Sequence, residues 1–313
     1  YSVVTRVEGQ AELAEREFNA AAAREFAPLF FEALGRNGTT CAMLRAGASE
    51  ESCEVVFEEA EKFGARVVFG MTLAGTDSAL ESSERLCRKW HGRAGGRLEY
   101  AFSPQDAAVC SEEFLREAAL LARKFDAFLQ APLAATRDGA AEVYNECGLL
   151  GDRSVLAHCI HLDEEEVRLL AESCSAVAHC PTANLFLNSG IMPLDRMLDA
   201  GLRVGLGSDI AGGPELDLWR VMRCAIESQK ARSFYQTGVR VPTAAEVFYL
   251  ATVGGACALG KEALIGTLDL GKDADLVVLD LAQALPYGAR GNLHCDLSAE
   301  VVITLIVYRG GPP

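Results

Sequence analysis

Three short apolar runs, each ending in a polar side chain, constrain the fold of this chain more than any other feature. The runs are SVLAHCIHLD (154–163), SAVAHCPTANLFLNSG (175–190) and GLRVGLGSDIAGG (201–213). Their polar tips are His158, His179 and Asp209. Amphipathic stretches separate the runs, so strand, polar tip and helix follow one another three times. Reactive side chains at the C-terminal ends of parallel strands are how a (β/α)8 barrel builds its site, and this is the architecture we expect.

The same alternation extends over most of the 313 residues. Strands are predicted near residues 39, 66, 98, 128, 155, 176 and 204, each followed by a helical pattern. Seven strand–helix units indicate a parallel α/β architecture that is one unit short of a closed barrel. A helical stretch at 10–35 precedes the first of these strands. We therefore expect the barrel's first strand to be missing from this chain and to lie upstream of Tyr1.

The end of the chain has a different pattern. Residues 241–260 read as a helix with a Gly-rich interruption, whereas 265–281 and 301–310 are rich in strand-forming residues. The sequence predicts a barrel domain over 1–260 and part of a small β-sandwich lobe over 261–313.

Charge and cysteine content restrict the partners and the compartment. Lys and Arg number 29 against 44 Asp and Glu, a net charge of −15, which argues against binding to nucleic acid or an anionic membrane surface. No apolar run approaches the roughly 20 residues that span a bilayer, and the N-terminus lacks the pattern of a signal peptide. The 11 cysteines are odd in number and form no C-x-x-C pair, which favours reduced thiols and a cytoplasmic location.

His158 and Asp209 are the strongest candidates for chemistry. In hydrolytic metal sites a divalent ion lowers the pKa of bound water to about 7, and a nearby His or carboxylate moves the proton. Each residue taken alone fits a structural role better, as a core histidine or as a helix cap. Their places at the tips of strands two units apart favour a functional role.

The other histidines are more ambiguous. His179 precedes Cys180-Pro181, and the segment through Asn184 could contact a substrate or form a structural turn. His161 and His91 are predicted to lie at the surface. The adjacent His-Cys pairs do not suggest a shared metal ion, because neighbouring residues of a strand point to opposite faces.

Several segments resemble the amidohydrolase superfamily and, more narrowly, its guanine deaminase branch. The resemblance is carried by VLAHCIHLDEEE, AHCPTANLFLNSG and GLGSDIAGG, and extends to NGTTCAML, VFYLATVGGACALG and IGTLDLGKDADLVVLDL. It implies a (β/α)8 barrel, one zinc ion, and hydrolytic deamination of guanine to xanthine and ammonia. It also implies that Asp209 binds the metal and takes the proton of the attacking water, while His158 faces that water and the substrate.

The chain departs from the family pattern where metal and substrate would bind. The His-x-His pair of the family's first strand is absent. The fifth-strand segment resembling Gln-Thr-His-Leu-Ala-Glu reads Gln-Ala-Pro-Leu-Ala-Ala, so Pro132 replaces a zinc ligand and Ala135 the acid–base glutamate. Gln105-Asp106 stands after the fourth strand, where the family has the purine-contacting Arg-Phe. We take Gln105, His179 and Asn184 as the candidate substrate contacts.

These departures leave three functional hypotheses. The chain is a guanine-deaminase-type zinc hydrolase, a non-catalytic homologue that serves as a binding or subunit scaffold, or a triazine- or adenosine-type deaminase. A catalytic zinc needs about three protein ligands, and loss of a proton shuttle costs about 10²–10⁴ in rate, so the sequence favours impaired or absent activity. The expected partners are a small purine and a second copy, as in a dimer, or another chain that covers the gap left by the first strand.

Overall fold

The computed structural model describes residues 17–47, 49–107, 109–136, 141–280 and 298–311. Its centre is an eight-stranded parallel sheet with the order β1-β2-β4-β5-β6-β7-β8, in which the short β3 pairs with β4. The strands are β1 (Cys41–Arg45), β2 (Arg66–Gly70), β3 (Thr72–Leu73), β4 (Leu98–Pro104), β5 (Phe128–Leu133), β6 (Ser154–His158), β7 (Ala176–His179) and β8 (Arg203–Leu206). Every predicted strand of the barrel is therefore present.

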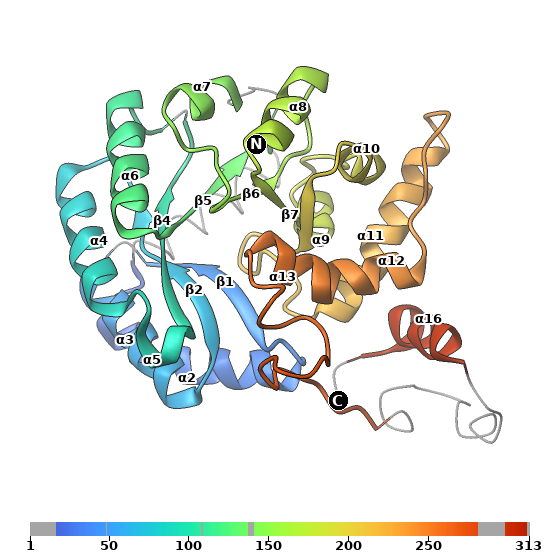
Figure 1. Cartoon of the computed structure of the whole chain (residues 1–313), viewed down its shortest axis with the longest axis horizontal. Coiled ribbons are helices and arrows are strands. Elements are labelled where there is room, and N and C mark those ends of the chain that lie inside the picture. The colour runs from blue at the N-terminus through green and yellow to red at the C-terminus, as the bar shows by residue number, and fades with distance from the viewer. Residues whose placement is uncertain (1–16, 48, 108, 137–140, 281–297, 312–313) are drawn as a thin grey trace.

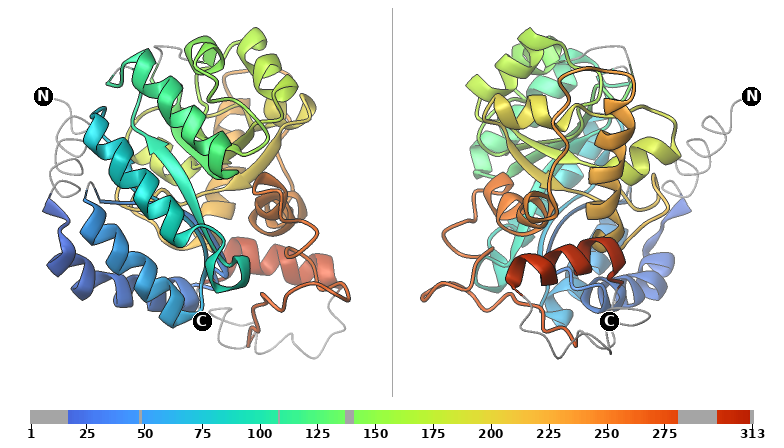
Figure 2. Two further views of the ribbon diagram at one scale, coloured as in Figure 1. Left: turned by 60° about the vertical axis from the view of Figure 1, so that its left-hand side comes forward. Right: turned by 90° about the vertical axis from the view of Figure 1, so that its right-hand side faces the viewer.

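Helices cover the outside of the curled sheet (Figure 1). Those before β8 are α2 (Ala20–Arg36), α3 (Glu50–Phe63), α4 (Asp77–Trp90), α5 (Arg93–Gly96), α6 (Glu112–Phe125), α7 (Ala141–Glu146), α8 (Glu164–Glu172), α9 (Pro181–Phe186) and α10 (Leu194–Asp199). Those after β8 are α11 (Leu218–Ser233), α12 (Ala244–Tyr249), the π-helix η1 (Leu250–Gly254), α13 (Gly255–Ala258) and α16 (Ala299–Arg309). Figure 2 shows α4 and α6 side by side along the outer face.

Capping residues explain where these helices begin. The side chains of Ser49 and Ser111 accept hydrogen bonds from the third residue of α3 and α6, and Asp163 forms a capping box with Glu166 at α8. The first turns of α3, α6 and α8 carry Glu side chains, which the positive end of the helix dipole stabilises. Pro28 lies inside α2 without ending it.

The two faces of the sheet pack against different partners. The outward face packs on the helices and includes Phe69, Tyr100, Leu129, Leu156 and Val177. The inward face consists of Val68, Ala101, Phe128, Val155 and Ala176, and packs against Ala258 of α13. Since successive residues of a strand point to opposite faces, these two sets fix the direction of the strand side chains near the candidate site.

The last described segments contradict the predicted strand content of residues 261–313. Residues 265–280 contain no strand, and 301–310, predicted as a strand, lies mostly within α16 (Figure 2). The β-branched run favours a strand locally, but the Ser298 side chain caps the helix, and Ile306 and Val307 are buried against α11 and α12. Tertiary burial therefore outweighs the local preference. The proposed boundary between the two domains, at residue 260, stays a prediction.

The segment after α13 crosses the N-terminal end of the sheet. Arg66, the first residue of β2, is 5% exposed and forms ion pairs with Asp273, at 2.5 Å, and with Asp275, at 2.7 Å. Lys261 forms a buried ion pair with Glu99 of β4. These contacts hold residues 261–275 at the N-terminal end of the sheet, opposite the candidate site.

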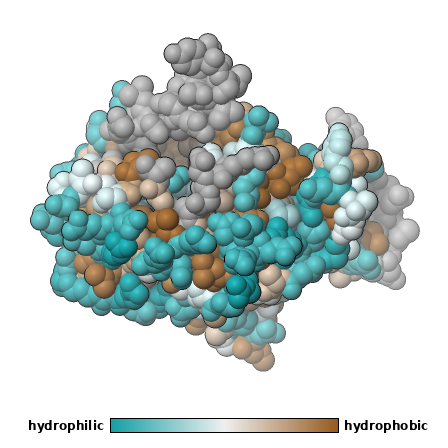
Figure 3. Space-filling model, turned by 90° about the horizontal axis from the view of Figure 1, so that it is seen from above, coloured by the Kyte–Doolittle hydropathy of each residue, from teal (hydrophilic) through white to brown (hydrophobic). Residues whose placement is uncertain are grey.

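Polar residues make up much of the described surface. Seen from above, it is mainly hydrophilic, with apolar areas separated by polar ones (Figure 3). No helix in the described ranges has the length and apolar character needed to cross a membrane. The cysteines of these ranges are unbridged, and most of them are buried.

Candidate active site

The structure brings His158 and Asp209 together at the C-terminal end of the sheet. His158 ends β6, and Asp209 follows β8 by three residues. The distance from His158 Nε2 to Asp209 Oδ2 is 4.0 Å. The two side chains remain partly open, with exposed fractions of 13% and 34%. The geometry fits the predicted pairing, while the catalytic roles of both residues stay predictions.

The backbone is unusual at these strand ends. Positive φ angles occur at His158 (74°), Cys159 (49°), Asp209 (49°), Ala211 (82°) and Ala134 (47°). Side chains other than glycine rarely adopt this left-handed region, and such strain clusters where the surrounding structure holds a functional geometry in place. The positive φ angles at His158 and Cys159 also end the alternation of side chains between the two faces of the sheet. The direction of the His158 side chain therefore could not be predicted from its position along β6.

His158 is held from the neighbouring βα unit. Its Nδ1 lies 2.9 Å from Oδ1 of Asn184, a residue of α9 that is 1% exposed. The structure thus brings Asn184 to His158 and buries it. Its predicted contact with substrate stays a prediction.

His179 lies on the other side of β7. Ala176 and Ala178 belong to the cluster on the inward face, so His179, one residue further, shares the helix-facing side with Val177. It is 1% exposed, and both ring nitrogens are buried without a hydrogen-bond partner among the described residues. Burial, together with the nearby His158, lowers the pKa of His179 to about 3, so the ring is neutral. A substrate could reach it only if the surrounding side chains moved.

Gln105 follows β4 at the same end of the sheet. It is half-buried, and its backbone N–H donates to the Leu73 carbonyl oxygen at 3.2 Å. No hydrogen bond in the described ranges joins its side chain to His158, Asp209 or Asn184. Its role in substrate binding also stays a prediction.

Burial dominates the electrostatics of Asp209. It raises the pKa of this carboxyl group above its ordinary value of 3.8, while His158 and Arg45 act in the opposite direction. Arg45 is the last residue of β1, on the far side of the curled sheet, and sequence reasoning did not identify it. The only signal was a charged residue at the end of an apolar strand.

The inward face of β5 carries Gln130 and Pro132. Gln130 Nε2 donates to the Leu44 carbonyl oxygen of β1 at 2.8 Å and to Ser103 Oγ of β4 at 2.9 Å. Gln130 therefore reaches across the sheet interior, and Pro132, two residues further, lies on the same face. The Pro132 carbonyl oxygen accepts a hydrogen bond from the Tyr144 hydroxyl at 2.9 Å. Gln130 was not among the predicted site residues.

The described residues do not fit a catalytic zinc ion. They contain no group of three His, Cys, Asp or Glu side chains positioned to share a metal. His158 and Asp209 supply two donors, whereas a catalytic zinc takes about three from the protein. Pro132 has no side-chain donor, and burial raises the pKa of the nearby Cys180 thiol well above its ordinary value, which keeps it protonated.

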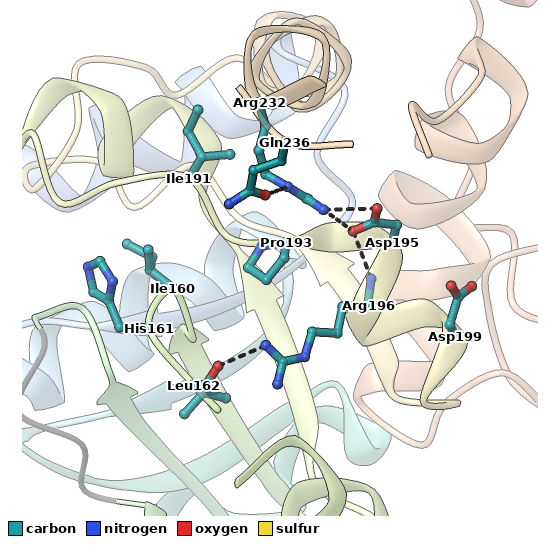
Figure 4. Close-up of a pocket in the computed structure, with 10 residues that line it drawn as sticks. All are labelled: Ile160, His161, Leu162, Ile191, Pro193, Asp195, Arg196, Asp199, Arg232 and Gln236. Carbon is teal, nitrogen blue, oxygen red and sulfur yellow. Dashed lines mark hydrogen bonds and ion pairs between the residues drawn. The ribbon is translucent and has the colours of Figure 1, made fainter. Parts of the chain in front are cut away.

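A separate cavity of about 570 Å³ lies beyond the end of β6 (Figure 4). Its polar groups mostly satisfy one another: Arg232 donates to both carboxylate oxygens of Asp195, and Arg196 donates to the Leu162 carbonyl oxygen. His161 also lines it and contacts the Ser189 carbonyl oxygen at 2.8 Å, so His161 is half-buried rather than a surface residue.

Sequence comparisons identify proteins related to this chain. Residues 6–308 match the model of the amidohydrolase family. The chain is 33% identical over 309 residues to guanine deaminase of Escherichia coli, covering 91% of this chain and 68% of that protein. It is 35% identical over 259 residues to 5-methylthioadenosine/S-adenosylhomocysteine deaminase of Moorella thermoacetica, covering 75% and 59%. The chain thus spans about two thirds of the length of these curated relatives.

Solved structures confirm the predicted fold. The E. coli guanine deaminase structure matches with a TM-score of 0.85 and 30% identity, covering 94% of this chain and 73% of that one. An adenosine deaminase from Xanthomonas campestris, solved with bound zinc, matches with a TM-score of 0.78 and 25% identity, covering 93% and 66%. The described sheet is an incomplete barrel of this type. The chain therefore belongs to the amidohydrolase family and is similar to its guanine deaminase branch.

Proposed function

We propose that this chain is a guanine-deaminase-like amidohydrolase whose hydrolytic activity is impaired or absent. The family relationship and the His158–Asp209 pair support the first part. In the reaction that the resemblance implies, water replaces the exocyclic amine of guanine, giving xanthine and ammonia. Here His158 and Asp209 would bind and orient a water molecule or a polar edge of the purine. No step through zinc is assigned, since the described residues do not fit that ion.

One observation carries the proposal of impaired activity. Pro132 lies on the inward face of β5, at the position where the resemblance places a histidine ligand, and Ala135 replaces the glutamate. A proline ring cannot bind a metal, and a methyl group cannot transfer a proton. The cost of losing a general acid–base group alone is about 10²–10⁴ in rate.

The alternative of a non-catalytic scaffold follows from the same observation. A purine could still bind at the C-terminal end of the sheet without being converted. We propose that such a scaffold acts in the cytoplasm, where its free thiols stay reduced, and that it pairs with a second copy or another chain along β1. Residues 41–44 of this edge strand are half-buried, and the described part of the chain supplies no further strand beside it.

A different specificity within the family has one observation in its favour. Identity to the M. thermoacetica 5-methylthioadenosine/S-adenosylhomocysteine deaminase, 35%, is as high as that to guanine deaminase. 5-Methylthioadenosine therefore belongs beside guanine in any assay of this protein.

The deciding experiment measures zinc content and turnover together. We expect the purified chain to hold far less than one zinc per molecule and to consume neither guanine nor 5-methylthioadenosine above background, as followed by ultraviolet absorbance. Stoichiometric zinc with guanine turnover would overturn the impaired-activity proposal. Stoichiometric zinc with turnover of 5-methylthioadenosine alone would support the other specificity.

A variant pair tests whether the two substitutions on β5 are responsible. P132H combined with A135E is expected to raise zinc binding. V109H combined with L120E adds the same residue types at positions that are 63% and 61% exposed, and is expected to leave zinc binding unchanged. Equal zinc binding by both double variants would count against a site at β5.

A further inference from the structure

Asn184 has a place in the fold that its predicted role does not explain. It lies within the short helix α9, where its backbone N–H donates to the Cys180 carbonyl oxygen at 2.9 Å. Its own carbonyl oxygen accepts from the Ser189 N–H at 2.9 Å. The side chain is 1% exposed, so direct contact with a ligand would require its neighbours to move. The backbone is thus fixed on both sides, and the amide points to protein rather than to the open end of the sheet.

The contact of this amide with His158 determines where the imidazole proton lies. Asn184 Oδ1 is 2.9 Å from His158 Nδ1. With the amide in this orientation, which leaves its Nδ2 buried without a partner among the described residues, Oδ1 accepts and the Nδ1–H of His158 donates. A neutral imidazole has one N–H, which leaves Nε2 as a bare acceptor. That nitrogen is the one 4.0 Å from Asp209 Oδ2.

We propose that Asn184 is a positioning residue that holds His158 in the Nδ1–H tautomer, with the lone pair of Nε2 directed toward the space beside Asp209. The left-handed backbone of His158, with φ of 74°, takes the residue out of the regular strand geometry. The contact with Asn184 is the hydrogen bond that holds the ring in this position. The anchor comes from the next βα unit, so the two units are coupled through one contact.

This proposal concerns the same site as the proposed function. Only its chemical consequence, the kind of ligand that His158 accepts, rests on that function. A bare Nε2 accepts a hydrogen bond from a water molecule or from an N–H group of a purine. It cannot donate to a carbonyl group of the ligand. The site would thus prefer a ligand that presents a donor to His158. The tautomer itself does not depend on turnover.

His161 provides an internal reference with the opposite tautomer. Its Nε2 lies 2.8 Å from the Ser189 carbonyl oxygen, so Nε2 carries the proton there. The two histidines are three residues apart in sequence. A method that distinguishes the ring nitrogens should therefore give reversed patterns for His158 and His161 in the same sample.

The test is ¹⁵N NMR of histidine-labelled protein, freed of metal by dialysis against a chelator and kept above pH 7.5. We expect a protonated-type shift for His158 Nδ1 and an unprotonated-type shift for Nε2, with the reverse at His161. H158Q assigns the signals by removing one set. In N184L the pure Nδ1–H pattern of His158 should be lost to a mixture of both tautomers.

Two further variants separate positioning from general packing. N184D keeps a carbonyl-type acceptor and should restore the Nδ1–H pattern. T182V changes a half-buried side chain of α9, whose buried hydroxyl has no partner among the described residues, and should leave the tautomer unchanged. An unaltered His161 signal shows that each variant is folded.

Either of two results would overturn the proposal: an Nε2–H pattern for His158 in the unmodified protein, or an unchanged tautomer in N184L. Failure of the proposed function would show instead as zinc content or turnover that contradicts it. The two proposals therefore fail in different measurements.

Discussion

At the scale of single residues, the candidate site depends on three histidines whose environments differ. His158 is partly open and hydrogen-bonded to Asn184, His161 lines a neighbouring cavity, and His179 is fully buried. Of these three, His158 is the one that faces a carboxylate, Asp209, across a partly open space. Burial rather than sequence position therefore separates the histidine suited to chemistry from the one that is part of the core.

His179 should make the protein sensitive to mild acid. Its pKa is lowered to about 3, against 6.5 for an ordinary histidine, so between these values the unfolded state binds a proton that the folded state does not. Stability must then fall as pH falls below 6.5. Between pH 7 and 5 the loss from this group is about 2 kcal/mol, which urea unfolding at the two pH values would measure.

The variant H179L should remove that part of the pH dependence. H161Q, which changes a half-buried ring in the adjoining loop, should retain it. If H179L lost as much stability between pH 7 and 5 as the unmodified protein, the buried neutral ring would not be the cause.

At the scale of elements, the direction of a side chain can be predicted from strand alternation within a strand but not at its end. Successive side chains point to opposite faces along β5, β6 and β7. The backbone becomes left-handed at Ala134 after β5, at Cys159 after β6 and at Asp209 after β8. These backbone angles set the directions of the His158 and Asp209 side chains. Elsewhere, strands approach each other so closely that only glycine fits.

Gly70, the last residue of β2, should be such a position. A Cβ atom there would overlap the Ala101 carbonyl oxygen and the Ser103 hydroxyl of β4. We expect G70A to lower the free energy of unfolding by about 2 kcal/mol or more, because β2 and β4 would have to separate.

The matched control is G64A at the end of α3. Gly64 has a φ of 77°, but no heavy atom lies within 4 Å of a Cβ built there, so the cost should be conformational strain of roughly 1 kcal/mol. Chemical denaturation compares the two. A larger loss for G64A than for G70A would refute the steric argument.

At the scale of the whole molecule, the described sheet has two edges with different surroundings. The β8 edge is covered, since η1 and α13 pack closely against it, and a Cβ on Gly205 would come within 3.1 Å of Gly255 Cα. At the β1 edge, residues 41–44 are half-buried, and no further strand pairs with it in the described ranges. An uncovered strand edge of a parallel sheet favours association.

We expect a second copy of the chain to cover β1. Light scattering on a sizing column should then give twice the chain mass at high concentration. Hydrogen exchange of the amides in Cys41–Arg45 should accelerate on dilution, while exchange in β6 stays constant. A monomeric mass with concentration-independent exchange in β1 would remove the case for a second copy.

The sequence by itself determined the positions of the barrel strands, the order of the units and the family relationship. These depend on apolar runs and short motifs, which are local in the chain. It also identified His158 and Asp209, because polar residues at strand ends are visible as a break in an apolar run. That Pro132 and Ala135 lack a suitable donor follows from their residue types, while the expectation of a ligand and an acid–base group there comes from the family resemblance.

Only the tertiary structure decided which of these side chains meet. The 4.0 Å approach of His158 to Asp209 joins residues 51 positions apart, and the direction of each depends on left-handed backbone angles that no periodicity predicts. Long-range packing also buried His179, placed Asn184 beside His158, and folded 299–309 into a helix. In each case contacts between distant segments outweighed the local preference.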